Sequence, residues 1–332
     1  MTAAAFDSGR LLAQLDEQWR QLGKSETGVL RACSMTLIAA AGAGRNPQEL
    51  GATLAELMRE HPSRTILLRV GQAGAPLETR TSIQCWMPFG RRQQICCEQI
   101  EIAAGLDSLS DVPPILFGLI VPDLPVALWC PDLDLALRPE LRPVLALAGK
   151  VIIDSSCLPA AAQAWQEIQT LQGARRRLAD LVWARLTRWR ELLFQALSGR
   201  DQRHAPFKAR ITWAGEPFPP AAMYLAAWLV SRLGWQDQVK ERVELACEDP
   251  AMPPPGSGRL RSLSLEGESC AIRLRRPAGE ALAIEIDGVS AGALFPVFDD
   301  AALLREELGV PGFDQQFEQS LTFCPAVLEA AP

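Results

Sequence analysis

The amino-acid sequence predicts an α/β protein: an N-terminal mixed sheet with packed helices, then a long connecting helix, then a smaller C-terminal α+β domain. Three observations support this fold class. Strand-like and helix-like segments alternate as far as residue 171, which is typical of helices packed on a sheet. Residues 180–197 repeat apolar side chains at helical spacing. Three short segments between residues 262 and 286 alternate apolar and polar side chains, which predicts antiparallel strands with one solvent-facing side.

The N-terminal domain is expected to cover residues 1–173. Its clearest helix start is Asn46, a good N-cap residue that Pro47 follows, and this helix should end before Pro62. The expected helices span residues 11–22, 46–60, 113–120 and 160–171. The expected strands span residues 29–40, 65–70, 82–87, 94–102, 125–130 and 151–154.

The long connecting helix is expected over residues 174–200. One apolar stripe along it contains Val182, Leu186, Trp189, Leu193 and Leu197. Trp183, Arg190 and Phe194 form a neighbouring stripe, and so wide an arc indicates a helix that bridges domains or offers anchors to another protein. Trp189 should therefore be core, whereas Trp183 and Arg190 should lie at a contact surface or domain junction, with Arg185 and Phe194 beside them.

The C-terminal domain is expected over residues 201–332. It should begin with a strand at 207–214 and a helix at 221–233, which Gly234 would end as its C-cap. The three antiparallel strands are expected at 262–265, 271–275 and 281–286, and a last helix at 299–308.

Composition excludes several classes of partner. The chain has 332 residues, 48% of them hydrophobic and 22% charged, and its formal net charge is −6. A mildly acidic chain has no electrostatic footprint for nucleic acid or for an anionic membrane. The N-terminus lacks the apolar core of a secretory signal, and no apolar run is long enough to span a bilayer. These features predict a cytoplasmic protein.

The nine cysteines indicate a reducing compartment more than a disulfide or zinc scaffold. Their number is odd, their spacing is irregular and no Cys-x-x-Cys pair occurs. Most should be small buried apolar residues. Cys96 and Cys97 differ because they are adjacent in a predicted strand, so that one of them should point away from the core. An exposed thiol at this pair could be oxidised.

The sequence contains no recognisable catalytic constellation, and we expect neither a cofactor nor a metal. Only two histidines occur, which limits any triad or metal site. The alternative function is a sugar-phosphate-binding enzyme on the N-terminal domain, with the glycine turn at residues 42–45, His61 and Arg64 as its site. Trp129 lies just before a predicted strand end, where open sheets bind ligands.

Five segments resemble one bacterial family, the OpcA glucose-6-phosphate dehydrogenase assembly proteins. They are residues 59–64 (REHPSR), 97–100 (CEQI), 121–126 (VPDLPV) with Trp129 and Pro131, 180–190 (DLVWARLTRWR) and 224–233 (YLAAWLVSRL). The resemblance extends over about residues 29–290, and the proline and tryptophan blocks are its specific part.

The resemblance implies a non-catalytic protein. Family members bind glucose-6-phosphate dehydrogenase, promote its active oligomer and raise its activity, and some cyanobacterial members are linked to thioredoxin-dependent control through cysteines. The resemblance therefore adds thioredoxin as a partner to test, although no cysteine here matches a regulatory position. His61, Arg64 and Trp129, which lie in the matching segments, join the contact or junction candidates.

Overall fold

The computed structural model describes residues 7–25, 28–88, 90, 93–172, 177–198, 207–250, 260–268, 270–276, 281–295, 298–310 and 312–332. The chain forms two compact units that interleave along the sequence. Unit 1 comprises Met1–Asp154, Leu171–Ala179 and Asp300–Gly312, and unit 2 comprises Ser155–Thr170, Asp180–Asp299 and Phe313–Pro332. Helices pack on a sheet in each unit, which confirms the predicted α/β class. The predicted division of the chain into three consecutive parts, with limits at residues 173 and 200, stays a prediction.

Unit 1 is built on a largely parallel sheet. Its strands are β1 (Val29–Arg31), β2 (Met35–Gly42), β3 (Ser63–Gly71), β4 (Glu78–Trp86), β5 (Gln94–Gly105), β6 (Val126–Cys130), β7 (Lys150–Ile153) and β8 (Arg177–Asp180). Their order is β1-β5-β3-β2-β6-β7-β8, and β4 pairs antiparallel with β5. Since β2 has β3 on one side and β6 on the other, the order of the chain reverses between β2 and β6.

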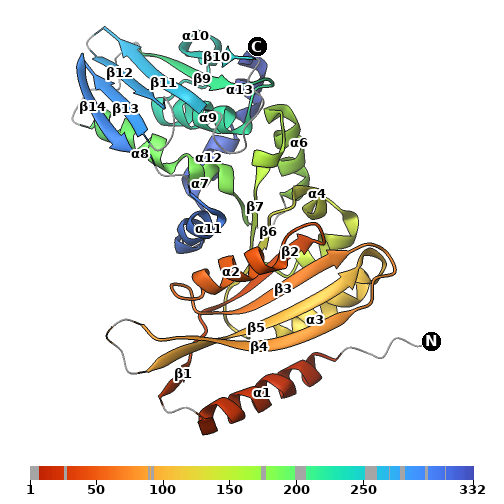
Figure 1. Cartoon of the computed structure of the whole chain (residues 1–332). Coiled ribbons are helices and arrows are strands. Elements are labelled where there is room, and N and C mark those ends of the chain that lie inside the picture. The colour runs from red at the N-terminus through yellow and green to blue at the C-terminus, as the bar shows by residue number, and fades with distance from the viewer. Residues whose placement is uncertain are drawn as a thin grey trace. The chain divides into compact units, whose positions relative to one another are not determined.

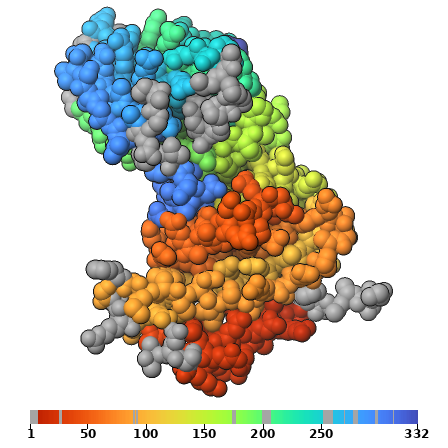
Figure 2. Space-filling view, in the orientation of Figure 1, coloured from red at the N-terminus to blue at the C-terminus, as the bar shows by residue number. Residues whose placement is uncertain are grey.

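Helices flank this sheet. They are α1 (Ser8–Ser25), α2 (Pro47–Leu57), α3 (Val112–Leu119), α4 (Leu133–Ala136), α5 (Arg142–Leu145) and α11 (Asp300–Gly309). Asn46 caps α2 as predicted, because its side-chain oxygen accepts the Gln48 N–H at 3.0 Å. The helix α1 lies beside β4, where Gln18 donates to the Thr81 carbonyl, and it forms part of the outer surface of unit 1 (Figures 1 and 2).

Unit 2 contains a second sheet and a largely buried helix. The strands, in spatial order, are β10 (Val243–Asp249), β9 (Lys208–Ala214), β11 (Leu260–Gly267), β12 (Cys270–Arg275), β13 (Ala281–Ile286) and β14 (Val289–Leu294). The helices are α6 (Ala161–Leu171), α7 (Leu181–Arg185), α8 (Thr187–Leu197), α9 (Pro220–Leu233), α10 (Val239–Arg242), α12 (Gln315–Leu321) and α13 (Cys324–Ala330). Residues 222–230 of α9 are all buried, so this helix is the centre of the core, and Gly234 ends it at φ +69° as predicted.

The predicted single long helix is wrong. Residues 177–180 are the strand β8, and the helical part that follows is divided at Leu186 into α7 and α8. Asp180 is the N-cap of α7, which explains why the residues before it are extended rather than helical. At the division the Leu186 N–H bonds to the Trp183 carbonyl, three residues back, which is a 3₁₀-type bond.

Candidate functional site

A buried carboxylate organises the start of α7. Asp180 is 0% exposed and accepts hydrogen bonds from the backbone N–H groups of Ser155 (3.1 Å) and Val182 (2.9 Å) and from the Tyr224 hydroxyl (2.8 Å). Burial raises the pKa of Tyr224 well above its ordinary value, so the hydroxyl stays protonated and remains a donor. Asp180 therefore joins three segments of unit 2 and carries a structural role.

Trp183 lies inside unit 2, next to this carboxylate network. It is 2% exposed, and its ring centroid lies 5.2 Å from Phe317 and 6.4 Å from Tyr224. The indole N–H donates to Asp314 at 2.7 Å, and the Arg190 guanidinium stacks on the ring at 3.6 Å from its centroid. Trp183 is thus buried in unit 2, which corrects the expectation of an exposed anchor, whereas its place at a domain junction stays a prediction; the stacked Arg190 is half-buried.

The remaining predicted residues of this segment separate into core and surface. Trp189 is 2% exposed and packs against Phe295, which confirms it as core. Arg185 is half-buried. Phe194 is 59% exposed on α8, so among the candidates of this segment it is the aromatic side chain that a partner can contact.

A buried ion cluster lies in unit 1. Glu98 on β5 is 5% exposed, and one of its oxygens accepts from the Trp19 indole N–H (2.7 Å) and pairs with Arg31. The second oxygen accepts a hydrogen bond from Nε of Arg64 and forms an ion pair with its Nη2, both at 2.6 Å. Arg64 also donates to the Leu119 carbonyl at 2.8 Å. Through these side chains the cluster links α1, β1, β3 and β5.

Sequence reasoning finds Arg64 but misses its partners. The two carboxylates Glu98 and Glu101, three residues apart, look like surface residues in the sequence, yet Glu98 is buried. The signal that could have identified it is its position inside the apolar run 95–100, because an acidic residue in a two-sided buried strand requires a cationic partner. Nothing local identifies Trp19 or Arg31 as that partner.

The glycine turn after β2 is filled by the chain's own carboxylate. Asp132 accepts the Gly42 N–H at 2.8 Å and the Arg45 Nε–H at 2.8 Å. This turn lies at the carboxyl end of the sheet where the strand order reverses, the usual place for a ligand in an open α/β sheet. Asp132 therefore already accepts the Gly42 N–H that a bound phosphate would need.

The residues of the alternative enzyme site do not converge. Arg64 pairs in register with Thr36 near the start of β2, whereas Gly42 pairs with Val70 at its end. Six residues of strand separate the two positions, or about 20 Å. His61 is half-buried two residues before β3, at the Arg64 end, and Trp129 is buried in β6. The turn, the histidine and the arginine therefore do not form one catalytic site.

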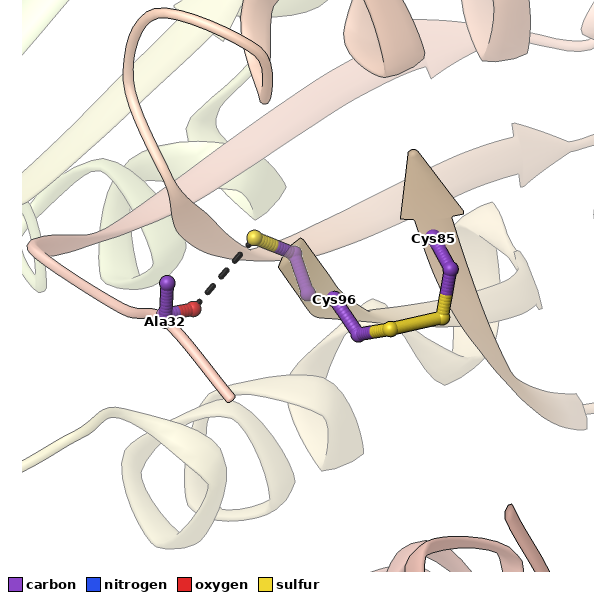
Figure 3. The surroundings of a disulfide bond; sticks show 4 residues. Ala32, Cys85 and Cys96 are labelled. Carbon is purple, nitrogen blue, oxygen red and sulfur yellow. Dashed lines mark hydrogen bonds between the residues drawn. A yellow bond between two sulfur atoms is a disulfide. The ribbon is translucent and has the colours of Figure 1, made fainter. Parts of the chain in front are cut away.

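The adjacent cysteines are both buried, which corrects the expectation of an exposed thiol in this pair. Cys96 forms a disulfide with Cys85, its direct neighbour across the β4–β5 pairing (Figure 3). Cys97 donates its S–H to the Ala32 carbonyl at 3.3 Å, and burial raises the pKa of its thiol to about 11. Of the two disulfide-bonded residues, Cys85 is the exposed one.

Two further kinds of functional feature are missing from the described residues. No helix among them is both long enough and apolar enough to cross a membrane. Among the residues that the structure describes, no group of three or more His, Cys, Asp or Glu side chains could hold a metal ion.

Comparison with family models gives two matches that cover most of the chain, both to the glucose-6-phosphate dehydrogenase subunit family OpcA. Residues 54–170 match the model of its N-terminal domain, and residues 176–321 match the model of its C-terminal domain. A protein of Nostoc punctiforme, named "Putative OxPP cycle protein OpcA", is 29% identical over 189 residues. A protein of the same name from Synechococcus elongatus is 26% identical over 194 residues. These matches cover 54% and 56% of this chain but only 40% and 43% of the relatives' own length.

Comparison with solved structures returns oxidoreductases at low similarity. An aldose-aldose oxidoreductase from Caulobacter crescentus has a TM-score of 0.48 and 10% identity over 90% of this chain and 97% of its own. A biliverdin reductase from Synechocystis has a TM-score of 0.46 and 13% identity over 89% and 98%. Likeness at this level supports no statement about activity.

Proposed function

Because the chain belongs to the OpcA family of glucose-6-phosphate dehydrogenase subunits, we propose that it binds glucose-6-phosphate dehydrogenase as a non-catalytic assembly factor in the cytoplasm. The observation that carries the proposal is the match of both halves of the chain to the two domains of this family, in order. The name shared by the two cyanobacterial relatives links it to the oxidative pentose phosphate cycle. The glycine turn that Asp132 fills supports a role other than phosphate chemistry at the sheet edge.

The proposed mechanism is a shift in population. The protein binds the active oligomer of the dehydrogenase more tightly than its inactive forms and so raises the active fraction. A tenfold activation needs only about 1.4 kcal/mol of differential affinity, which a few buried contacts supply.

Co-purification with the dehydrogenase of the same cell tests this function. The mixture should show a larger dehydrogenase oligomer and a higher specific activity than the enzyme alone. The isolated chain should show no turnover of sugar phosphates. Saturable turnover by the pure chain, or an unchanged oligomer and activity, would overturn the proposal in favour of the enzyme alternative.

The first prediction concerns Phe194. The F194A variant should keep its fold, since the side chain is 59% exposed, but should weaken dehydrogenase binding at least tenfold, about 1.4 kcal/mol, if this aromatic is an interface anchor. Binding is measured by titration with the purified dehydrogenase. The matched control is F117A, because Phe117 is 73% exposed on α3 in unit 1. An equal loss of affinity for the dehydrogenase in both variants, or no loss in F194A, would show that Phe194 is not an interface anchor.

The second prediction concerns thioredoxin as a further partner. The thiolate of thioredoxin would attack the sulfur of the exposed Cys85, form a mixed disulfide with it and release Cys96 as a thiol. The second thiol of thioredoxin would then attack this mixed disulfide and release Cys85 as a thiol, which leaves thioredoxin as a disulfide. After incubation with reduced thioredoxin, alkylation and mass mapping should find new label on Cys85, the exposed residue of the disulfide. Cys97 should stay unlabelled, because it is buried and its pKa lies at about 11.

A C85S variant is the control for the thioredoxin experiment, since it has no disulfide to reduce. It should show the same labelling before and after treatment. If a small dithiol reduces the wild-type disulfide and thioredoxin does not, thioredoxin is not a partner at this site.

A further inference from the structure

The ion cluster of unit 1 borders a cavity that the proposed function does not use. The cavity has a volume of about 330 Å³ and is lined by Arg31, Ala32, Cys33, Arg64, Glu98 and Val121. This volume is within the range of small-molecule sites, about 300–1,000 Å³. The cavity lies at the start of β3, far from the Asp132-filled turn at the ends of β2 and β6.

The charges that line the cavity do not balance. Arg31 and Arg64 carry two positive charges against the single carboxylate of Glu98. Each oxygen of Glu98 already accepts one hydrogen bond and forms an ion-pair contact with one guanidinium nitrogen, so Glu98 has little capacity to hold either arginine more fully. The lining therefore has one positive charge in excess, which favours an anion.

The two arginines differ in how they are held. Arg64 is more than nine-tenths buried and is fixed by Glu98 and by the Leu119 carbonyl. The side chain of Arg31 is 51% exposed, although Glu98 holds its Nη2 and its guanidinium lies 5.3 Å from the centroid of the Trp19 ring. The ion pair with Glu98 is formed by Nη2, so the half-exposed guanidinium keeps N–H donors that can reach an anion at the cavity mouth.

We propose that this cavity binds the oxyanion group of a small metabolite, a phosphate or a carboxylate, between Arg31 and Arg64. Arg31 supplies the adjustable charge-assisted hydrogen bond and Arg64 the fixed charge behind it. Glu98 is the positioning residue that holds both guanidinium groups toward the same space. This site is independent of dehydrogenase binding, so either proposal can fail without the other.

Calorimetric titration of the full chain at constant ionic strength tests the site, with inorganic phosphate and acetate as separate probes and chloride as the reference anion. We expect saturable binding of at least one probe and, in R31Q, a loss of affinity of at least tenfold. R31K should recover part of the affinity, because it restores the charge without the planar guanidinium. R20Q is the matched control, since Arg20 is an exposed arginine of α1 outside the cavity, and it should bind like the wild type.

Each outcome decides the matter. Binding of phosphate alone identifies a phosphate site, and binding of acetate alone identifies a carboxylate site. Absence of saturable binding overturns the proposal, as does binding that R31Q and R20Q weaken equally, because the effect is then general screening of surface charge.

Discussion

Replacement of Glu98 by alanine is expected to lower the free energy of unfolding by about 3–5 kcal/mol. The carboxylate is 5% exposed, accepts two hydrogen bonds and forms ion pairs with Arg31 and Arg64, and its loss leaves Arg64 buried at 8% exposure without a counter-charge. It also removes the acceptor of the Trp19 indole N–H, which ties α1 to β5. Denaturant titration followed by circular dichroism measures the change.

The control for Glu98 lies on the same strand. Glu101 is half-buried and accepts a long hydrogen bond from Gln99 at 3.3 Å, so E101A should cost no more than about 1 kcal/mol. The E98Q variant should be destabilised as well. One of the two accepting oxygens becomes an NH₂ group, which donates hydrogen bonds and cannot accept one from the neighbouring N–H groups. A midpoint for E98A equal to that of E101A would contradict the structural role of the cluster.

Segments whose structure is decided locally could be predicted from the sequence. Asn46 with Pro47 marks the start of α2, and Gly234 marks the end of α9, since capping depends on a few adjacent residues. The antiparallel strands β11 to β13 follow from period-two alternation alone. In each case the physical cause lies within one turn or one strand.

Segments whose structure depends on distant partners could not be predicted. The apolar periodicity of residues 180–197 is compatible with one helix, and no proline or glycine in this segment marks the division at Leu186. The shorter helix α7 packs against α9, a partner that the local pattern does not indicate. The edge strand β14 consists largely of small residues with low strand propensity. Its extended structure therefore depends on the pairing with β13 and not on its own sequence.

The candidate site shows the same division. The aromatic and arginine content of α7 and α8 is visible in the sequence, but which side of each helix is buried is not. Trp183 lies inside because Asp314, 131 residues later, accepts its indole N–H. Phe194 lies outside. The Arg31 and Arg64 cavity requires a carboxylate 34 residues beyond Arg64, which no local pattern indicates.

Replacement of Asp180 by alanine is expected to be the most damaging change in unit 2, lowering the free energy of unfolding by about 3–5 kcal/mol. Three buried donors lose their acceptor together: two backbone N–H groups and the Tyr224 hydroxyl. The loss of the N-cap of α7 adds about 1 kcal/mol within that range. Denaturant titration followed by tryptophan fluorescence measures the change, because Trp183 lies in the same core.

Two milder variants separate the contributions of this network. The Y224F variant removes one donor and leaves both backbone bonds, so it should cost about 1–2 kcal/mol. The D180N variant keeps an oxygen for the two backbone N–H groups and turns its amide toward the Tyr224 oxygen, which can accept, so its cost should lie between those of Y224F and D180A. This order follows from the number of donors left without an acceptor. If D180A were no worse than Y224F, the backbone bonds to Ser155 and Val182 would contribute little, and the carboxylate would not be what holds α7 at the start of its helix.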